Sequence, residues 1–264
     1  MSETEEENDD VESESESESE SESESENDNV EDETDKPLPE TTTQTALFVA
    51  GGVTVASAAA VGIAFSHPDS PLMLGSMGVV YAVLAGLTVR RLMNRDEFDE
   101  QMRPRAGDLS IGALVAALLY AVAMAVHLVV TSPPSPRSAW IMQIYAALGD
   151  PSSEYRHAIG GVVFLVAALE ELVWRGLVMR VLTEKFGWLR GWLLQAGLFG
   201  LAHTPTLFLL GNPMAGPNPL LVAAGIAYSL VWGRLAMRLD RLPPALFAHA
   251  FFTWGVFEFP IWRP

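Results

Sequence analysis

Residues 46–66 read ALFVAGGVTVASAAAVGIAFS, a stretch without one charged side chain. A helix needs about 20 such residues to cross roughly 30 Å of hydrocarbon. The outer helices of a large soluble protein would instead carry a charged stripe at helical spacing, and this stretch has none. Residues 46–66 are therefore predicted to form a membrane-spanning helix.

Six further apolar runs of similar length follow, each bounded by Pro, Gly or charged clusters that interrupt helices. With the first run they predict an all-α fold, a polytopic membrane bundle of about seven transmembrane helices. The six runs cover residues 71–89, 109–131, 158–180, 189–210, 219–237 and 243–262.

The basic residues give an orientation for these seven spans. Cytoplasmic loops carry an excess of Lys and Arg, and 13 of the 16 bases lie on the side of the N-terminus if all seven runs cross. We therefore expect a multi-pass protein of the cell (plasma) membrane with a cytoplasmic N-terminal tail.

The first 45 residues differ in composition from the rest of the 264-residue chain. They hold 20 of the 33 acids and one of the 16 bases, with unbroken Glu/Ser alternation over residues 12–26. Such a segment has too little apolar surface to offset the entropy of ordering. We expect a disordered acidic tail at 1–45 and a transmembrane helical domain at 46–264. The tail, together with 14 Arg against 2 Lys, also favours a halophilic, high-salt cytoplasm.

The absence of cysteine limits the chemistry. With no Cys in the sequence, disulfides, thiolate zinc sites, iron–sulfur ligation and a cysteine nucleophile are excluded.

The run 158–180 contains three charged residues in its inner half before it ends at Arg180, namely Glu170, Glu171 and Arg175. Each costs about 2.5 to 3.5 kcal/mol at the centre of a membrane helix, so this helix must face a bundle interior or a water-filled cavity. Glu171 and Arg175 have the i,i+4 spacing and order of a favourable ion pair. Glu170 points about 100° away and keeps a carboxylate free for proton transfer. The alternative is an acid cluster that only ties helices together.

Two later runs each carry one histidine. His203 lies in the run 189–210, and His249 lies in the run 243–262 with Thr253 one turn later. A lone intramembrane His is usually a packing residue. With Glu170, however, three helices offer titratable groups at comparable depth, which suits holding a water molecule and moving its protons.

The residues EELVWR at 170–175 resemble the EExxxR motif of the CPBP family, the CAAX proteases and bacteriocin-processing enzymes, also called Abi. Phe199 to His203 is similar to the FxxxH motif of that family, and His249 to the histidine of its third motif. The resemblance covers roughly residues 155–260. The third motif commonly has Asn or Asp four residues after the histidine, and here that position is Thr253.

The resemblance implies an intramembrane endopeptidase acting on prenylated or membrane-bound substrates, with membrane lipid as a partner and no nucleic acid. In that interpretation Glu170 activates a water held with His203, and His249 and Thr253 stabilise the oxyanion. Glu171 and Arg175 would orient Glu170. Two hypotheses on metal stay open: a metal-free Glu/His site, slightly favoured, or a zinc held by Glu170, His203 and His249.

Two other classes of function are compatible with these residues. A non-catalytic scaffold or partner-binding protein would keep the family core for folding, and Thr253 is the feature that favours it. A proton-coupled transporter would also bury Glu and His, but it predicts internal repeats or broken helices in both halves, and the sequence has neither.

Overall fold

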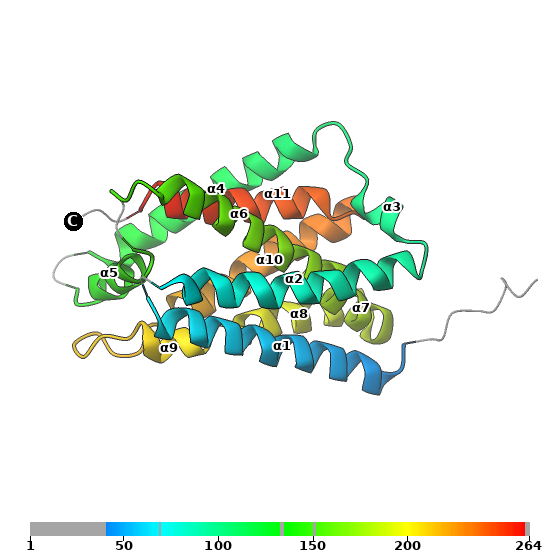
Figure 1. The fold of residues 1–264 in the computed structure, drawn as a ribbon, viewed down its shortest axis with the longest axis horizontal. Helices are drawn as coiled ribbons and strands as arrows, with labels where there is room; N and C mark the ends of the chain where they lie inside the picture. The colour runs from blue at the N-terminus through cyan, green and yellow to red at the C-terminus, as the bar shows by residue number, and fades with distance from the viewer. Residues whose placement is uncertain (1–40, 69, 133–134, 150–151, 262–264) are drawn as a thin grey trace, which may run out of the picture. The chain divides into compact units, whose positions relative to one another are not determined.

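The structure is a computed structural model that describes residues 41–68, 70–132, 135–149 and 152–261 (Figure 1). These residues form helices and no strand. The predicted acidic tail, apart from residues 41–45, lies outside the described part. The helices are α1 (Thr43–Ser66), α2 (Pro71–Met93), α3 (Phe98–Met102), α4 (Asp108–Val130), α5 (Ser138–Ala147), α6 (Arg156–Val173), the π-helix η2 (Trp174–Met179), α7 (Arg180–Phe186), α8 (Trp188–Ala202), α9 (Pro205–Leu209), α10 (Leu220–Leu239) and α11 (Pro243–Glu258).

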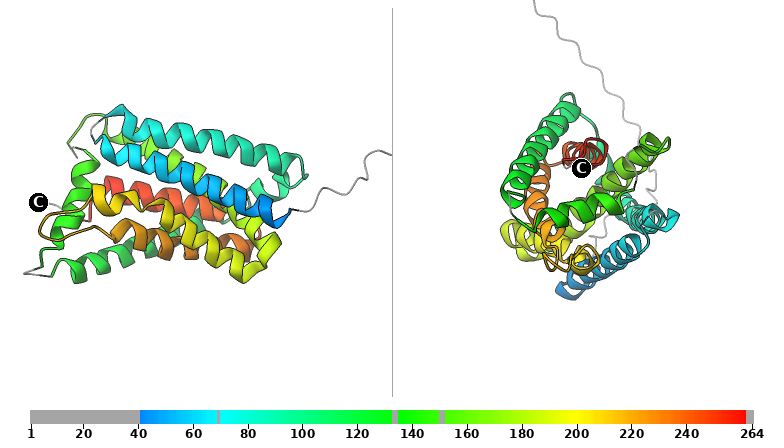
Figure 2. Two further views of the ribbon diagram at one scale, coloured as in Figure 1. Left: turned by 90° about the horizontal axis from the view of Figure 1, so that it is seen from below. Right: turned by 90° about the vertical axis from the view of Figure 1, so that its left-hand side faces the viewer.

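Helices lie over all seven apolar runs, with small differences at the ends. The first begins at Thr43 rather than at residue 46, because Thr42 caps it by accepting a hydrogen bond from the Thr45 backbone N–H (3.1 Å). The last ends at Glu258 rather than at residue 262. The long helices run alongside one another, and α1 begins at the opposite end of the bundle from the end of α11 (Figures 1 and 2).

Four described helices are long and apolar enough to cross a membrane: α1, α2, α4 and α10. Their outward surfaces are apolar, with Phe48, Val55 and Val129 exposed by 83%, 70% and 77%. The buried interior instead contains carboxylates, an arginine and a glutamine. An apolar exterior around a polar interior is the arrangement expected of a protein whose solvent is lipid.

Helix α11 packs against both α4 and α6, and close contact with α4 fixes its position. Asp108, at the start of α4, pairs with Arg241 just before α11 (2.6 Å). One turn on, Gly112 lets α4 approach so closely that a Cβ there would lie 2.4 Å from Phe247 Cβ. These contacts set the depth of α11, which carries His249.

Two irregularities interrupt the helices near the predicted site. The π-helix η2 joins α6 to α7 and begins at Trp174, three residues after Glu171, and π segments frequently occur at functional sites. The run 189–210 breaks into α8 and α9 at Pro205, which lacks the backbone N–H that would continue α8 and stands at the first turn of α9. Arg175 and His203 lie at these two interruptions.

Candidate active site

A fully buried ion pair forms the base of the site. Arg175 Nη1 lies 2.7 Å from Glu171 Oε1, and neither side chain has any exposed surface, which confirms the predicted i,i+4 pair. Arg175 Nη2 also donates to the backbone oxygen (3.2 Å) and Oγ (2.9 Å) of Ser229 on α10. Ser229 Oγ lies 3.3 Å from Gln195 Oε1 on α8. Glu171 and Ser229 therefore hold the guanidinium directly, and Gln195 supports it through Ser229.

His249 is positioned by the same carboxylate. Its Nδ1 lies 2.7 Å from Glu171 Oε1, so Nδ1 carries the hydrogen that the carboxylate accepts. Trp232 stacks on the imidazole with ring centroids 3.8 Å apart and an interplanar angle of 21°. The family resemblance implied that Glu171 and Arg175 orient Glu170. Among the described contacts they instead fix the ring of His249, and that ring faces Glu170.

Glu170 keeps a free carboxylate oxygen. Its Oε2 lies 3.7 Å from His249 Nε2, while its Oε1 is buried without a hydrogen-bond partner among the described residues. The Tyr81 hydroxyl accepts a hydrogen bond from Trp174 Nε1 (3.1 Å) and lies near the side chains of Glu170 and Ser57. The two adjacent glutamates therefore have different surroundings, as their separation around the helix predicts.

His203 lies at the C-terminus of α8, where the helix loses its regular hydrogen bonds. The backbone N–H of His203 bonds to Gly200 rather than to Phe199 (3.0 Å). The Phe199 carbonyl is thereby released, and it accepts a hydrogen bond from His203 Nδ1 (2.8 Å). With Nδ1–H donating, Nε2 is the nitrogen that can accept a proton.

Phe199 connects the two histidines. Its ring centroid lies 4.9 Å from that of His203 and 6.1 Å from that of His249. The Arg175 guanidinium is 5.3 Å from the same ring. Gly225 of α10 packs against the same histidine, and a Cβ there would be in ordinary van der Waals contact with His203 Nδ1, at 3.5 Å. The first and last residues of the FxxxH motif therefore act together.

Thr253 lies one turn after His249 and is partly buried. It forms no hydrogen bond with another residue in the described part of the chain. The structure joins Glu170, Glu171, Arg175 and His249 in one network and links His203 to it through the Phe199 ring. No contact among the described residues connects Thr253 to that network.

Six buried polar atoms on residues of this region have no hydrogen-bond partner among the described residues. An unpaired buried polar atom costs about 1 to 3 kcal/mol, so a group of them marks a place where water or a polar ligand binds. The atoms are Ser57 Oγ, Glu170 Oε1, Glu171 Oε2, Arg175 Nε, Gln195 Nε2 and Trp232 Nε1.

The arrangement does not fit a three-ligand metal site. Both histidines have the Nδ1 hydrogen bond that often orients a metal ligand, with Glu171 for His249 and the Phe199 carbonyl for His203. However, no three His, Asp or Glu side chains among the described residues lie close enough to share an ion. No step below is therefore derived through a metal.

Five further residues surround the site that the sequence did not single out: Ser57, Tyr81, Gln195, Ser229 and Trp232. Gln195 and Ser229 had a usable signal, because polar side chains inside apolar spans usually make contacts between helices. Tyr81 and Trp232 are ordinary residues of apolar spans, and nothing in their local sequence distinguishes them.

Comparison with known proteins identifies the region that contains these motifs. Residues 153–255 match the family model described as type II CAAX prenyl endopeptidase Rce1-like. No curated protein and no solved structure matches the chain. The resemblance inferred from the three motifs is thus confirmed.

Proposed function

Through residues 153–255 the chain carries an Rce1-like domain of the CAAX protease family, and from this we propose that it is an intramembrane endopeptidase. Its substrates are prenylated or otherwise membrane-associated proteins. The observation that carries the proposal is the buried Glu170, whose free Oε1 leaves it able to act as a base while its Oε2 faces His249 Nε2 at 3.7 Å.

In the proposed reaction, Glu170 removes a proton from water as the water oxygen attacks the scissile carbonyl carbon. His203 Nε2 accepts a hydrogen bond from that water and orients it, since Nδ1 is committed to Phe199. The proton then passes from Glu170 to the leaving nitrogen, the C–N bond breaks, and the new carboxyl and amine ends separate. Glu170 returns to its starting charge.

His249 has a different role in this mechanism. Glu171 holds its Nδ1–H, which aims Nε2 at the region around Glu170. When both ring nitrogens carry a proton, Nε2 donates to the oxyanion of the tetrahedral intermediate. Arg175 and the stacked Trp232 hold this ring and its carboxylate in place rather than contacting the substrate. The unpaired Thr253 hydroxyl is a second candidate donor to the oxyanion.

We place the site in the cytoplasmic half of the plasma membrane, with seven crossings and the N-terminal tail in the cytoplasm. The asymmetry of Arg and Lys supports this topology, as does the position of the start of α1 and the end of α11 at opposite ends of the bundle. The predicted site residues lie on the three crossings other than α1, α2, α4 and α10. These three crossings are shorter or carry charge because they face other helices.

The test is cleavage of a prenylated CAAX peptide by the purified full-length protein in lipid vesicles. Glu170→Gln keeps size and hydrogen bonding but removes the proton acceptor, so turnover should fall by about 100-fold or more. Glu184→Gln, a surface change of the same chemistry, should cleave like the wild type. If Glu170→Gln cleaves normally, or the wild type cleaves no prenylated or membrane peptide, the non-catalytic scaffold becomes the better explanation.

A further inference from the structure

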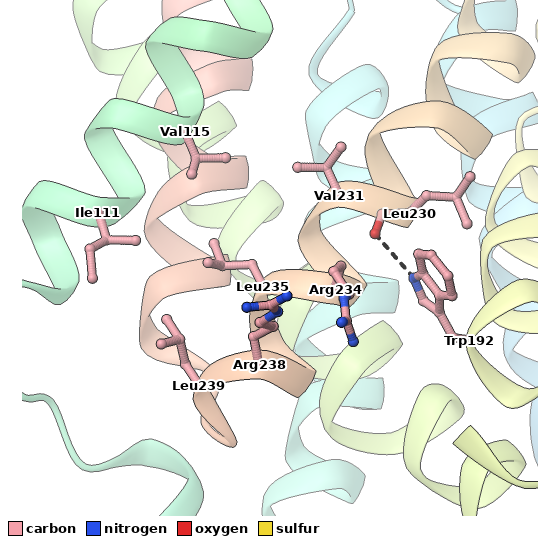
Figure 3. Close-up of a pocket in the computed structure, with 9 residues that line it drawn as sticks. All are labelled: Ile111, Val115, Trp192, Leu230, Val231, Arg234, Leu235, Arg238 and Leu239. Atoms are coloured by element: carbon pink, nitrogen blue, oxygen red, sulfur yellow. Dashed lines mark hydrogen bonds between the residues drawn. The ribbon is translucent and has the colours of Figure 1, made fainter. Parts of the chain in front are cut away.

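An open apolar groove lies between α4 and α10 (Figure 3). Its volume is about 600 Å³, within the range of roughly 300 to 1,000 Å³ typical of small-molecule sites. It forms where α4 and α10 both pack against α11. The lining residues are Ile111, Val115, Trp192, Leu230, Val231, Arg234, Leu235, Arg238 and Leu239.

The length of the groove corresponds to half of a bilayer. The lining extends along α10 from Leu230 to Leu239, which at 1.5 Å per residue is about 14 Å. The hydrocarbon of one leaflet is about 15 Å thick, half of roughly 30 Å. Trp188, exposed at the start of α8 and 5.9 Å from Arg234, is the kind of residue found at the membrane–water boundary. Because Trp188 meets Arg234, in the middle of this stretch, the groove crosses that boundary and its Leu230 end reaches into the hydrocarbon.

Two cations border the groove without an acid beside them. Arg234 and Arg238 are exposed, lie one turn apart, and form no ion pair or hydrogen bond with another described residue (Figure 3). Four other arginines at this end of the bundle pair with acids, namely Arg91, Arg95, Arg180 and Arg241. Arg90 on α2 is also exposed and forms no ion pair with a described residue, but it lies outside the groove. The two unpaired guanidinium groups thus favour an anionic partner from outside the chain.

We propose that this groove binds one anionic phospholipid of the adjacent leaflet. Its hydrocarbon chain lies between α4 and α10, and its phosphate contacts Arg234 and Arg238. Basic pockets between transmembrane helices select anionic headgroups in this way, and guanidinium groups bind phosphate with paired hydrogen bonds. Helix α10 separates the groove from the candidate active site, because Trp232 stacks on His249 while the neighbouring Val231 lines the groove. The proposal does not depend on peptidase activity.

The test is native mass spectrometry of the full-length protein, titrated with phosphatidylglycerol or with phosphatidylcholine of the same chains. Wild type should bind phosphatidylglycerol at least tenfold more tightly than phosphatidylcholine. The double variant Arg234→Gln/Arg238→Gln should lose about tenfold or more of that affinity. Arg90→Gln, which removes another exposed arginine from the last turn of α2, should change it by less than about twofold.

A second variant tests separately whether the groove binds the hydrocarbon chain of the lipid. Val115→Trp fills the α4 wall of the groove and should weaken phosphatidylglycerol binding while both arginines remain. Thermal unfolding of each variant checks that it is folded. Equal binding of the two lipids, an unchanged double variant, or the same loss in Arg90→Gln would overturn the proposal. Complete displacement of phosphatidylglycerol by a farnesylated peptide would assign the groove to substrate instead.

Discussion

Glu171→Gln tests whether one buried carboxylate supports both the fold and the chemistry. Glu171 Oε1 accepts from Arg175 Nη1 and from His249 Nδ1, each at 2.7 Å, and the side chain has no exposed surface. The amide keeps an oxygen of similar size but removes the negative charge. Arg175 then remains as a buried cation whose hydrogen bonds to Ser229 cannot neutralise it.

The expected loss of stability is large relative to the whole free energy of unfolding of a native domain. Breaking a buried ion pair by removing one partner costs about 3 to 5 kcal/mol, and we take about 3 because Arg175 keeps Ser229. Native domains are stable by only about 5 to 15 kcal/mol. For a domain of this size each kcal/mol lowers Tm by about 2 to 4 °C, so Tm should fall by about 10 °C. Turnover should also fall by about 100-fold, because His249 loses the anion that fixes its tautomer.

The assay pairs thermal unfolding in detergent with peptide cleavage in vesicles. Glu184→Gln is the matched control, since Glu184 also contacts two arginines, Arg91 (3.2 Å) and Arg95 (3.0 Å), but is about one-third exposed. An exposed pair contributes at most about 1 kcal/mol, so this control should lower Tm by no more than a few degrees.

A double variant separates the two roles of Glu171. Adding Arg175→Met to Glu171→Gln removes the stranded charge, and replacing a buried ion pair by apolar residues is often neutral or stabilising. The double variant should therefore regain most of the stability that Glu171→Gln loses, while its cleavage stays low. The reasoning is refuted if Glu171→Gln unfolds and cleaves like the control, or if the double variant is less stable than Glu171→Gln alone.

Three further outcomes are expected. Tyr81→Phe should lower turnover about tenfold in the vesicle assay, because it removes a hydroxyl that interacts with Glu170. Gly112→Ala should cost about 1 to 3 kcal/mol in thermal unfolding, since its Cβ would meet Phe247 at 2.4 Å. Deleting residues 1–40 should leave cleavage at fixed salt within about twofold and Tm unchanged, because that segment has too few apolar residues to join a core.

The positions of the helices could be predicted from sequence because they depend on local features. Apolar length, Pro, Gly and charge clusters gave the seven helical regions within a few residues of their ends. The Glu171–Arg175 pair was predictable for the same reason, since helical geometry alone brings positions i and i+4 together. The acidic tail and the number of crossings remain predictions.

Which residues contact one another between different helices could be learned only from the tertiary structure. A helix such as α1, apolar nearly all round, gives no signal for which face turns inward. The sequence therefore could not show that Tyr81 on α2 lies near both Ser57 on α1 and Glu170, or that Glu171 holds His249. Those contacts depend on how helices rotate and cross, and packing of side chains far apart in the chain sets both. The sequence alone identified the charged residues that had to face inward, and the packing of the helices determined what each one meets there.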